Sequence, residues 1–175
     1  MRHRRSTQGA YCAAEFDDFA AGAGGRLLHL ATLLTAEPPD ANPRARRLLV
    51  DALAHTYAAW RQLRGDDPYA HARDRLVVRF AGDAWRVWRV WRVWRVWEAL
   101  PHAGTQPSGA VLAGLTTHER LVVVLRLHEG VAEEQAAALL GLSEHRVRAL
   151  CTVAVAEVLR PRRPRSVALP GAAPS

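Results

Sequence analysis

The sequence contains no lysine and only two cysteines, and each scarcity narrows the possible functions. All 24 basic residues are arginine, and the formal net charge is +7. Because a guanidinium meets phosphate with two parallel hydrogen bonds, this surplus favours a polyanionic partner. An excess of arginine and alanine also follows from a GC-rich genome, which is an equally good explanation. Cys12 and Cys151 lie far apart and outside any partner motif, which indicates neither a disulfide framework nor a zinc site.

Long apolar segments are also absent. No apolar run approaches the roughly 18 residues of a membrane span, and the N-terminal stretch "MRHRRSTQGAYCAAEF" lacks the apolar core of a signal peptide. With 175 residues, 49% of them hydrophobic, the chain can still build the core of one ordinary domain or two small ones. We therefore expect a globular cytoplasmic protein.

The hydrophobic pattern has the period of a helix and not that of a strand. Leucines recur at intervals of three and four over 27–34, and a second helical pattern runs over 48–60. A third helix is expected after Asp67, which can cap it, and Pro68 suits the first helical position. The sequence therefore predicts an all-α fold.

The stretch "LPHAGTQPSG" at 100–109 has two prolines and two glycines, which is typical of a flexible linker. It divides the chain into two predicted helical domains, the second of which contains a helix-turn-helix. The expected organisation is a basic N-terminal tail at 1–14, a helical domain at 15–100, a linker at 101–113, a second helical domain at 114–160 and a disordered tail at 161–175.

The second domain begins with a recognisable helix start. Thr116 precedes Glu119 by three residues, so the hydroxyl and the carboxylate can each satisfy a backbone amide of the other residue. Gly130 can end the helix that follows. The sequence thus predicts one helix over 117–130.

The spacing of Ala137, Gly141 and Val147 matches a helix-turn-helix. The small residue lets two helices approach, the glycine accepts the backbone angles of the turn, and the branched side chain packs between the helices. Any small helical hairpin can use alanine and glycine in this way, but here a basic face accompanies the spacing. The residues expected at DNA are Ser143, as the cap of the second helix, with His145, Arg146, Arg148 and Thr152 on its exposed side.

The stretch "LTTHERLVVVLRLHEGVAEEQAAALLGLSEHRVRALCTVAVAEVL" at 115–159 resembles region four of bacterial sigma factors of the extracytoplasmic-function type. The stretches "LLHLATLLT", "ALAHTYAAW" and "DDPYAHARDRLVVRF" resemble region two more weakly. The resemblance implies a transcription initiation factor that directs RNA polymerase to promoters. Its implied partners are promoter DNA, core RNA polymerase and an inhibitory anti-sigma protein.

The chain departs from the family at several positions. Arg46, Arg47 and Val50 stand where the polymerase-binding helix of the family usually has an acidic pair followed by glutamine. Reversing charge at an interface replaces attraction with repulsion, so polymerase binding through this surface is in doubt. Val78 stands where asparagine is common, and Leu150 where a basic residue is usual.

A Trp-Arg-Val unit occurs four times in "AWRVWRVWRVWRVWEA", and a fifth tryptophan closes the repeat. Successive tryptophans in a helix rotate by about 300°, so five of them form no single stripe. Either the rings stack on single-stranded DNA while the arginines bind phosphate, or the repeat is an expansion of a permissive basic segment. The candidate single-strand contacts are Trp85, Arg86, Trp88 and Arg89.

No constellation of catalytic residues, no metal-ligand spacing and no phosphate loop is recognisable, so we expect neither an enzyme nor a cofactor. Three functions remain open. The first is a sigma-like initiation factor. The second is a stand-alone helix-turn-helix regulator, or a decayed sigma paralogue, without productive polymerase binding. The third is an interaction module held by an inhibitory partner.

Overall fold

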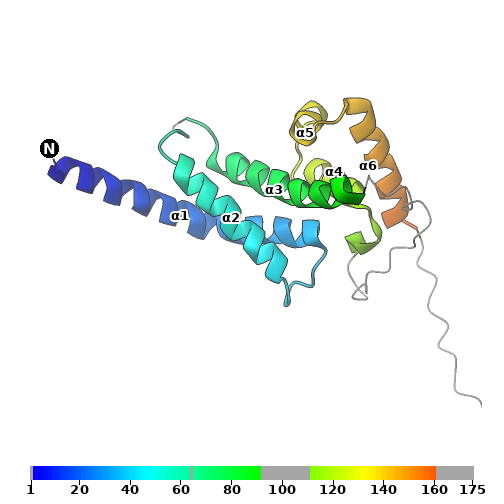
Figure 1. Ribbon diagram of the computed structural model, residues 1–175, viewed down its shortest axis with the longest axis horizontal. Coiled ribbons are helices and arrows are strands. Elements are labelled where there is room, and N and C mark those ends of the chain that lie inside the picture. The colour runs from blue at the N-terminus through cyan, green and yellow to red at the C-terminus, as the bar shows by residue number, and fades with distance from the viewer. Residues whose placement is uncertain (1, 64, 92–110, 161–175) are drawn as a thin grey trace, which may run out of the picture.

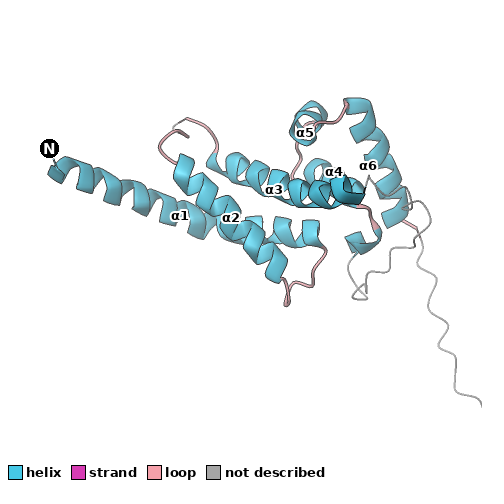
Figure 2. Ribbon diagram, in the orientation of Figure 1, coloured by secondary structure: helices cyan, strands magenta, loops and turns pink. Residues whose placement is uncertain are grey.

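The computed structural model describes residues 2–63, 65–91 and 111–160, and every regular element in these ranges is a helix (Figure 2). The all-α prediction is therefore confirmed for the part of the chain that is described. In chain order the elements are α1 (Arg2–Thr35), α2 (Pro43–Ala59), α3 (Pro68–Trp91), the short 3-10 turn η2 (Val111–Gly114), α4 (Thr117–Val123), the π-helical turn η3 (Val124–His128), α5 (Glu133–Leu140) and α6 (Glu144–Val158).

Helices α1, α2 and α3 pack against one another, with α2 crossing α1 (Figure 1). Local hydrogen bonds fix where α2 and α3 begin. The carboxylate of Glu37 accepts from the backbone N–H groups of Arg44 at 3.1 Å and Ala45 at 2.8 Å. Asp67 Oδ1 accepts from the N–H of Tyr69 at 2.9 Å. Each carboxylate satisfies amides that have no partner within their own helix and lies where the helix dipole favours negative charge.

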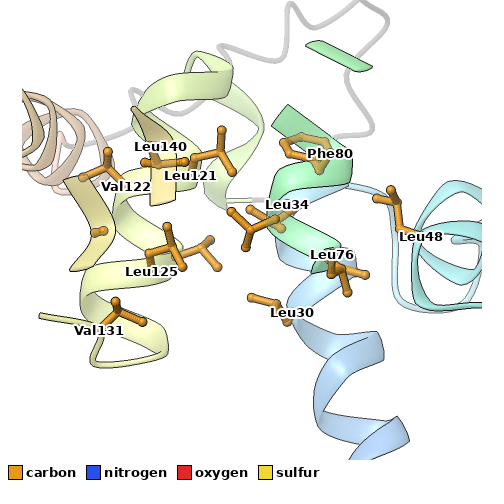
Figure 3. Packing of buried hydrophobic residues seen from close by; sticks show 14 of the residues in the cluster. Leu30, Leu34, Leu48, Leu76, Phe80, Leu121, Val122, Leu125, Val131 and Leu140 are labelled. Atoms are coloured by element: carbon orange, nitrogen blue, oxygen red, sulfur yellow. The ribbon is translucent and has the colours of Figure 1, made fainter. Parts of the chain in front are cut away.

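The two predicted domains share one apolar core. Leu30 and Leu34 of α1 lie near Leu76 of α3, and the same cluster continues to Leu121 and Leu125 of the second half (Figure 3). All five side chains are buried, and burying a leucine contributes about 1.5–3 kcal/mol. The remaining fully buried large aliphatic side chains are Leu27, Val77, Val122, Val124 and Val147.

A half-buried arginine strengthens this junction. The Arg120 guanidinium donates to three carbonyl oxygens: Leu34 at the end of α1, Leu112 in η2 and Leu115 after it, at 3.0 to 3.1 Å. Burial lowers the pKa of Arg120, and the nearby Arg44 lowers it further. Arg120 thus joins the C-terminal end of α1 to the start of the second half of the chain.

A second polar contact lies at the other end of the junction. The side chain of Glu129 is fully buried, and its two carboxylate oxygens each lie 3.0 Å from the hydroxyl of Tyr69. Arg26 of α1 lies 3.4 Å from the same carboxylate, and its guanidinium carbon sits 4.2 Å from the centre of the Tyr69 ring. Helices α1 and α3 therefore both contact the segment that follows η3.

Two expectations about element boundaries differ from the structure. Residues 2–14, expected to form a tail, belong to α1, which begins at Arg2. The helix expected over 117–130 continues from α4 into a π-helical turn, in which the N–H of Glu129 donates to the carbonyl of Val124 at 3.0 Å. Gly130 then takes φ +67°, a left-handed conformation that ends the helix. Most of the expected linker, residues 101–110, lies outside the described residues, as does the expected tail at 161–175.

Candidate nucleic-acid interface

The turn between α5 and α6 has a defined hydrogen-bond pattern. Gly141 has φ +65° and ψ +33°, in the left-handed region that glycine adopts without steric cost. The N–H of Leu142 donates to the carbonyl of Ala137 at 3.0 Å, and the N–H of Gly141 points to Ala138 at 3.4 Å. This pair of bonds is a Schellman motif, which ends α5 sharply and directs the chain into α6.

Ser143 caps the next helix. It has an extended backbone, and its hydroxyl accepts from the N–H of Arg146 at 3.3 Å. Both halves of the predicted capping box also occur earlier in the chain, because Thr116 Oγ1 accepts from Glu119 N–H and the Glu119 carboxylate accepts from Thr116 N–H. The sequence therefore located the starts of α4 and α6 correctly.

Apolar contacts fix the orientation of α6. Val147 and Ala154 are fully buried, Leu150 is nearly so, and α6 packs on both α4 and α5. Ala137 is buried at the approach of α5, as the spacing predicted. Because Leu150 belongs to this buried side, its position is not available for a DNA contact.

The opposite side of α6 is exposed and carries the predicted DNA contacts. His145, Arg148 and Thr152 lie on it, Ser143 lies at its beginning, and exposed Arg146 lies on the flank of the helix. Figure 1 shows α6 along one edge of the molecule, where α5 and α4 cover only its inner side. All five predicted residues are therefore accessible, but Arg146 and Arg148 lie about 160° apart around the helix, on its two flanks.

Sequence reasoning missed an acidic residue on this face. The Arg148 guanidinium makes two contacts with the Glu133 carboxylate, Nη2–Oε1 at 2.7 Å and Nε–Oε2 at 3.4 Å. Arg148 also accepts at its carbonyl from the Thr152 hydroxyl at 3.0 Å. Glu133 occupies the first turn of α5, so the turn that brings α5 against α6 places a carboxylate beside the basic side chain. The only sequence signal is the acidic pair that opens α5.

His118 is a second missed residue. It lies in the first turn of α4 and is half-buried. Burial lowers its pKa below the usual 6.5, the positive charge of Arg146 lowers it further, and Glu119 raises it. His118 therefore lies within electrostatic reach of the exposed face and senses its charge.

In the first half of the chain, the three departures on α2 are all at the surface. Arg46 and Arg47 are exposed, and Val50 is 66% exposed. Arg46 Nε donates to Asn42 Oδ1 at 3.0 Å. Val78 of α3 is also exposed. These four side chains are therefore available to a partner.

The Trp-Arg-Val repeat is described only in part. Helix α3 continues through Trp85 and Trp88 to Trp91, so the repeat begins as a helix. The side chains of Trp85, Arg86, Trp88 and Arg89, and the backbone beyond Trp91, lie outside what the structure describes.

Within the described ranges, no three histidine, cysteine or acidic side chains are grouped closely enough to hold a metal ion. No helix searched there has the length and apolar character needed to cross a membrane.

The chain matches no model of a known protein family, no curated protein and no solved structure.

Proposed function

We propose that the chain is a sigma-like DNA-binding protein, in which α5 and α6 form a helix-turn-helix and α6 is the recognition helix. The observation that carries the proposal is the exposed surface of α6, which presents His145, Arg148 and Thr152 on one side and Arg146 on its flank, on a helix fixed by buried Val147. A capped helix held by two neighbours presents side chains at fixed positions to the major groove.

The side chains on this face suit both kinds of contact that a duplex offers. Arginine binds phosphate oxygens and reads guanine with two hydrogen bonds, while threonine reaches either base edges or phosphate. Arg146 lies in the first turn of α6, the part of a recognition helix that contacts bases. Arg148 is held by Glu133 and must exchange that carboxylate for phosphate on binding.

A duplex-selection experiment tests this proposal. From a random library, the full chain should enrich a preferred sequence, and Arg146→Ala should weaken binding to that sequence by about 1–3 kcal/mol. Arg75→Ala is the matched control, because Arg75 is also exposed but lies on α3. Unchanged affinity for both Arg146→Ala and Arg148→Ala would remove α6 from the interface.

Glu133→Gln should strengthen duplex binding, whereas the two arginine substitutions should weaken it. Losing the carboxylate frees Arg148 for phosphate and removes a negative charge that repels DNA. The variant should bind duplex more tightly at low salt, with a smaller gain at high salt because added ions screen the charge. Weaker binding by this variant would contradict the placement of Arg148 at the DNA.

The second candidate is a stand-alone helix-turn-helix regulator that does not use polymerase. The exposed surface of α2 favours a regulator over an initiation factor, because it carries Arg46, Arg47 and Val50 where a polymerase-binding helix would need acidic and amide side chains. A pull-down with core RNA polymerase followed by run-off transcription separates the two. Stable association and promoter-dependent transcripts support an initiation factor, whereas duplex binding without either supports the regulator.

A further inference from the structure

The surface of α2 that faces solvent combines apolar and basic side chains. Val50 is 66% exposed and Tyr57 is 52% exposed, and Ala54 between them is exposed as well. At about 100° per residue, these three side chains fall within a 60° arc, and Arg46 and Arg47 lie at its two edges. We refer to Arg46, Arg47, Val50, Ala54 and Tyr57 as the α2 stripe.

The α2 stripe is held rigid by aromatic packing at one end. The ring of Tyr57 lies edge-on to Phe16 of α1, with centroids 4.9 Å apart, and Phe16 also meets Trp60 at 5.2 Å. Phe19 packs against Trp60 at 5.2 Å. Since Tyr57 already has a fixed neighbour, a partner that covers the stripe has little side-chain freedom to remove.

A complementary surface lies on α1. Tyr11 is 74% exposed, and Glu15 and Asp18 are exposed at four and seven residues beyond it. These spacings place the three side chains within about 60° of one another on the helix. We refer to Tyr11, Glu15 and Asp18 as the α1 stripe.

The α1 stripe and the two arginines of the α2 stripe lie toward opposite ends of the crossed pair of helices. Phe16 meets Trp60 at one end, while Asn42 Nδ2 donates to Thr32 Oγ1 at 3.0 Å at the other, so α1 and α2 run antiparallel. The N-terminal part of α1 also extends beyond α2 (Figure 1). The α1 stripe therefore lies too far from Arg46 and Arg47 of its own chain to cover them.

We infer that these two stripes bind each other between two copies of the chain, so that the α1 stripe of each copy covers the α2 stripe of the other. A two-fold axis satisfies both contacts at once, which is the usual symmetry of a homodimer. Glu15 and Asp18 meet Arg46 and Arg47, while Tyr11 packs over Val50 with its ring available to an arginine.

The apolar members of the α2 stripe favour protein over nucleic acid as the occupant. Phosphate would satisfy the arginines but leave Val50 and Tyr57 in water, whereas a helix carrying Tyr11 covers them. Exposed Arg61 near the acidic end and exposed Asp40 near the basic end oppose this pattern by one charge each.

Sedimentation velocity of the full chain over a concentration series tests the inference through charge exchange. The wild type should dimerise reversibly, and the dimer should weaken at high salt. Arg46→Glu with Arg47→Glu, and separately Glu15→Arg with Asp18→Arg, should each raise the dissociation constant at least ten-fold. Mixing the two variants should restore a dimer, because both contacts of the mixed dimer again join opposite charges. Arg75→Glu, an equal charge change on the exposed side of α3, should leave dimerisation unchanged.

Circular dichroism establishes that each variant folds. Arg46 bonds Asn42, so if its substitution unfolds the chain, Arg47→Glu with Val50→Asp replaces that variant. A wild type that stays monomeric throughout the series, or a dimer indifferent to both charge reversals, overturns the inference. Loss of DNA affinity in the arginine variant without any change in mass also overturns it, because α2 would then bind phosphate.

Discussion

Arg120 Nη1 donates to the carbonyl oxygen of Leu34 at 3.0 Å, across 86 residues of sequence. The last carbonyls of a helix have no partner inside it, and the macrodipole makes them attractive to a cation. Arg120 therefore caps α1 from the second half of the chain. Its other two bonds, to Leu112 and Leu115, fix the turn that leads into α4.

We expect Arg120→Ala to destabilise the protein by about 1–3 kcal/mol, because three part-buried carbonyls lose a charged donor at once. Arg120→Lys should recover only part of this, since an ammonium cannot reproduce the planar fork that meets three acceptors. Urea denaturation measures the change, and Arg75→Ala, at an exposed site, should alter stability by under about 0.5 kcal/mol. An equally small effect of Arg120→Ala would show that water replaces the guanidinium without cost.

Local sequence signals predicted most of the helices but not how the two halves meet. The Thr116 and Ser143 caps, the glycine turn at Gly141 and the buried position of Val147 depend on residues a few positions apart, which a sequence displays directly. Contacts such as Arg120 with Leu34 join distant residues and leave no local spacing to recognise. The same holds for Glu133, whose pairing with Arg148 depends on the angle between α5 and α6.

Tyr69 should titrate unusually late. Burial raises its pKa, and the adjacent Glu129 carboxylate raises it further, to about 12, although Arg26 and Arg73 oppose the shift. Because this folded pKa exceeds the unfolded value, the associated stability is present below about pH 10 and is lost as the pH rises toward 12. Absorbance titration should therefore show a late phenolate that is absent in Tyr69→Phe.

At neutral pH the same Tyr69→Phe variant should be less stable by about 1–3 kcal/mol, because the buried Glu129 carboxylate loses a donor. Tyr11→Phe, at a largely exposed residue, serves as the control and should leave the free energy of unfolding almost unchanged. Equal stability of the two variants would mean that Arg26 and water satisfy Glu129 without the hydroxyl.

The turn at Gly141 offers a test of backbone conformation alone. A Cβ built there meets nothing within 4 Å, so Gly141→Ala adds no clash. The φ of +65° still costs an alanine about 1–2 kcal/mol, and asparagine less. Gly22→Ala is the matched control: Gly22 is exposed within α1 and also has open space, so alanine there should stabilise by about 0.5–1 kcal/mol. Thermal unfolding that moves in the same direction for both alanine variants would contradict this reasoning.

His118 reports on the charge of the proposed DNA-binding face. Burial lowers its pKa and Arg146 lowers it further, so Arg146→Ala should raise the pKa without restoring the usual value, because burial remains. NMR titration of the imidazole, assigned with His118→Gln, measures this. Arg148→Ala is the control, since that guanidinium is paired with Glu133 and does not contribute to the shift.

The depressed pKa of His118 also links stability and DNA binding to pH. As the pH falls below about 6.5, the unfolded chain takes up a proton at His118 before the folded chain does. The stability that His118 contributes is therefore present above about pH 6.5 and falls as the pH drops through that value. His118→Gln should therefore flatten the dependence of the melting temperature on pH between about 5 and 7. Phosphate bound at Arg146 would offset the positive charge that disfavours protonated His118, so duplex binding should take up protons and tighten as the pH falls toward 6. A duplex affinity independent of pH in the wild type, with the NMR shift confirmed, would place the phosphates away from Arg146.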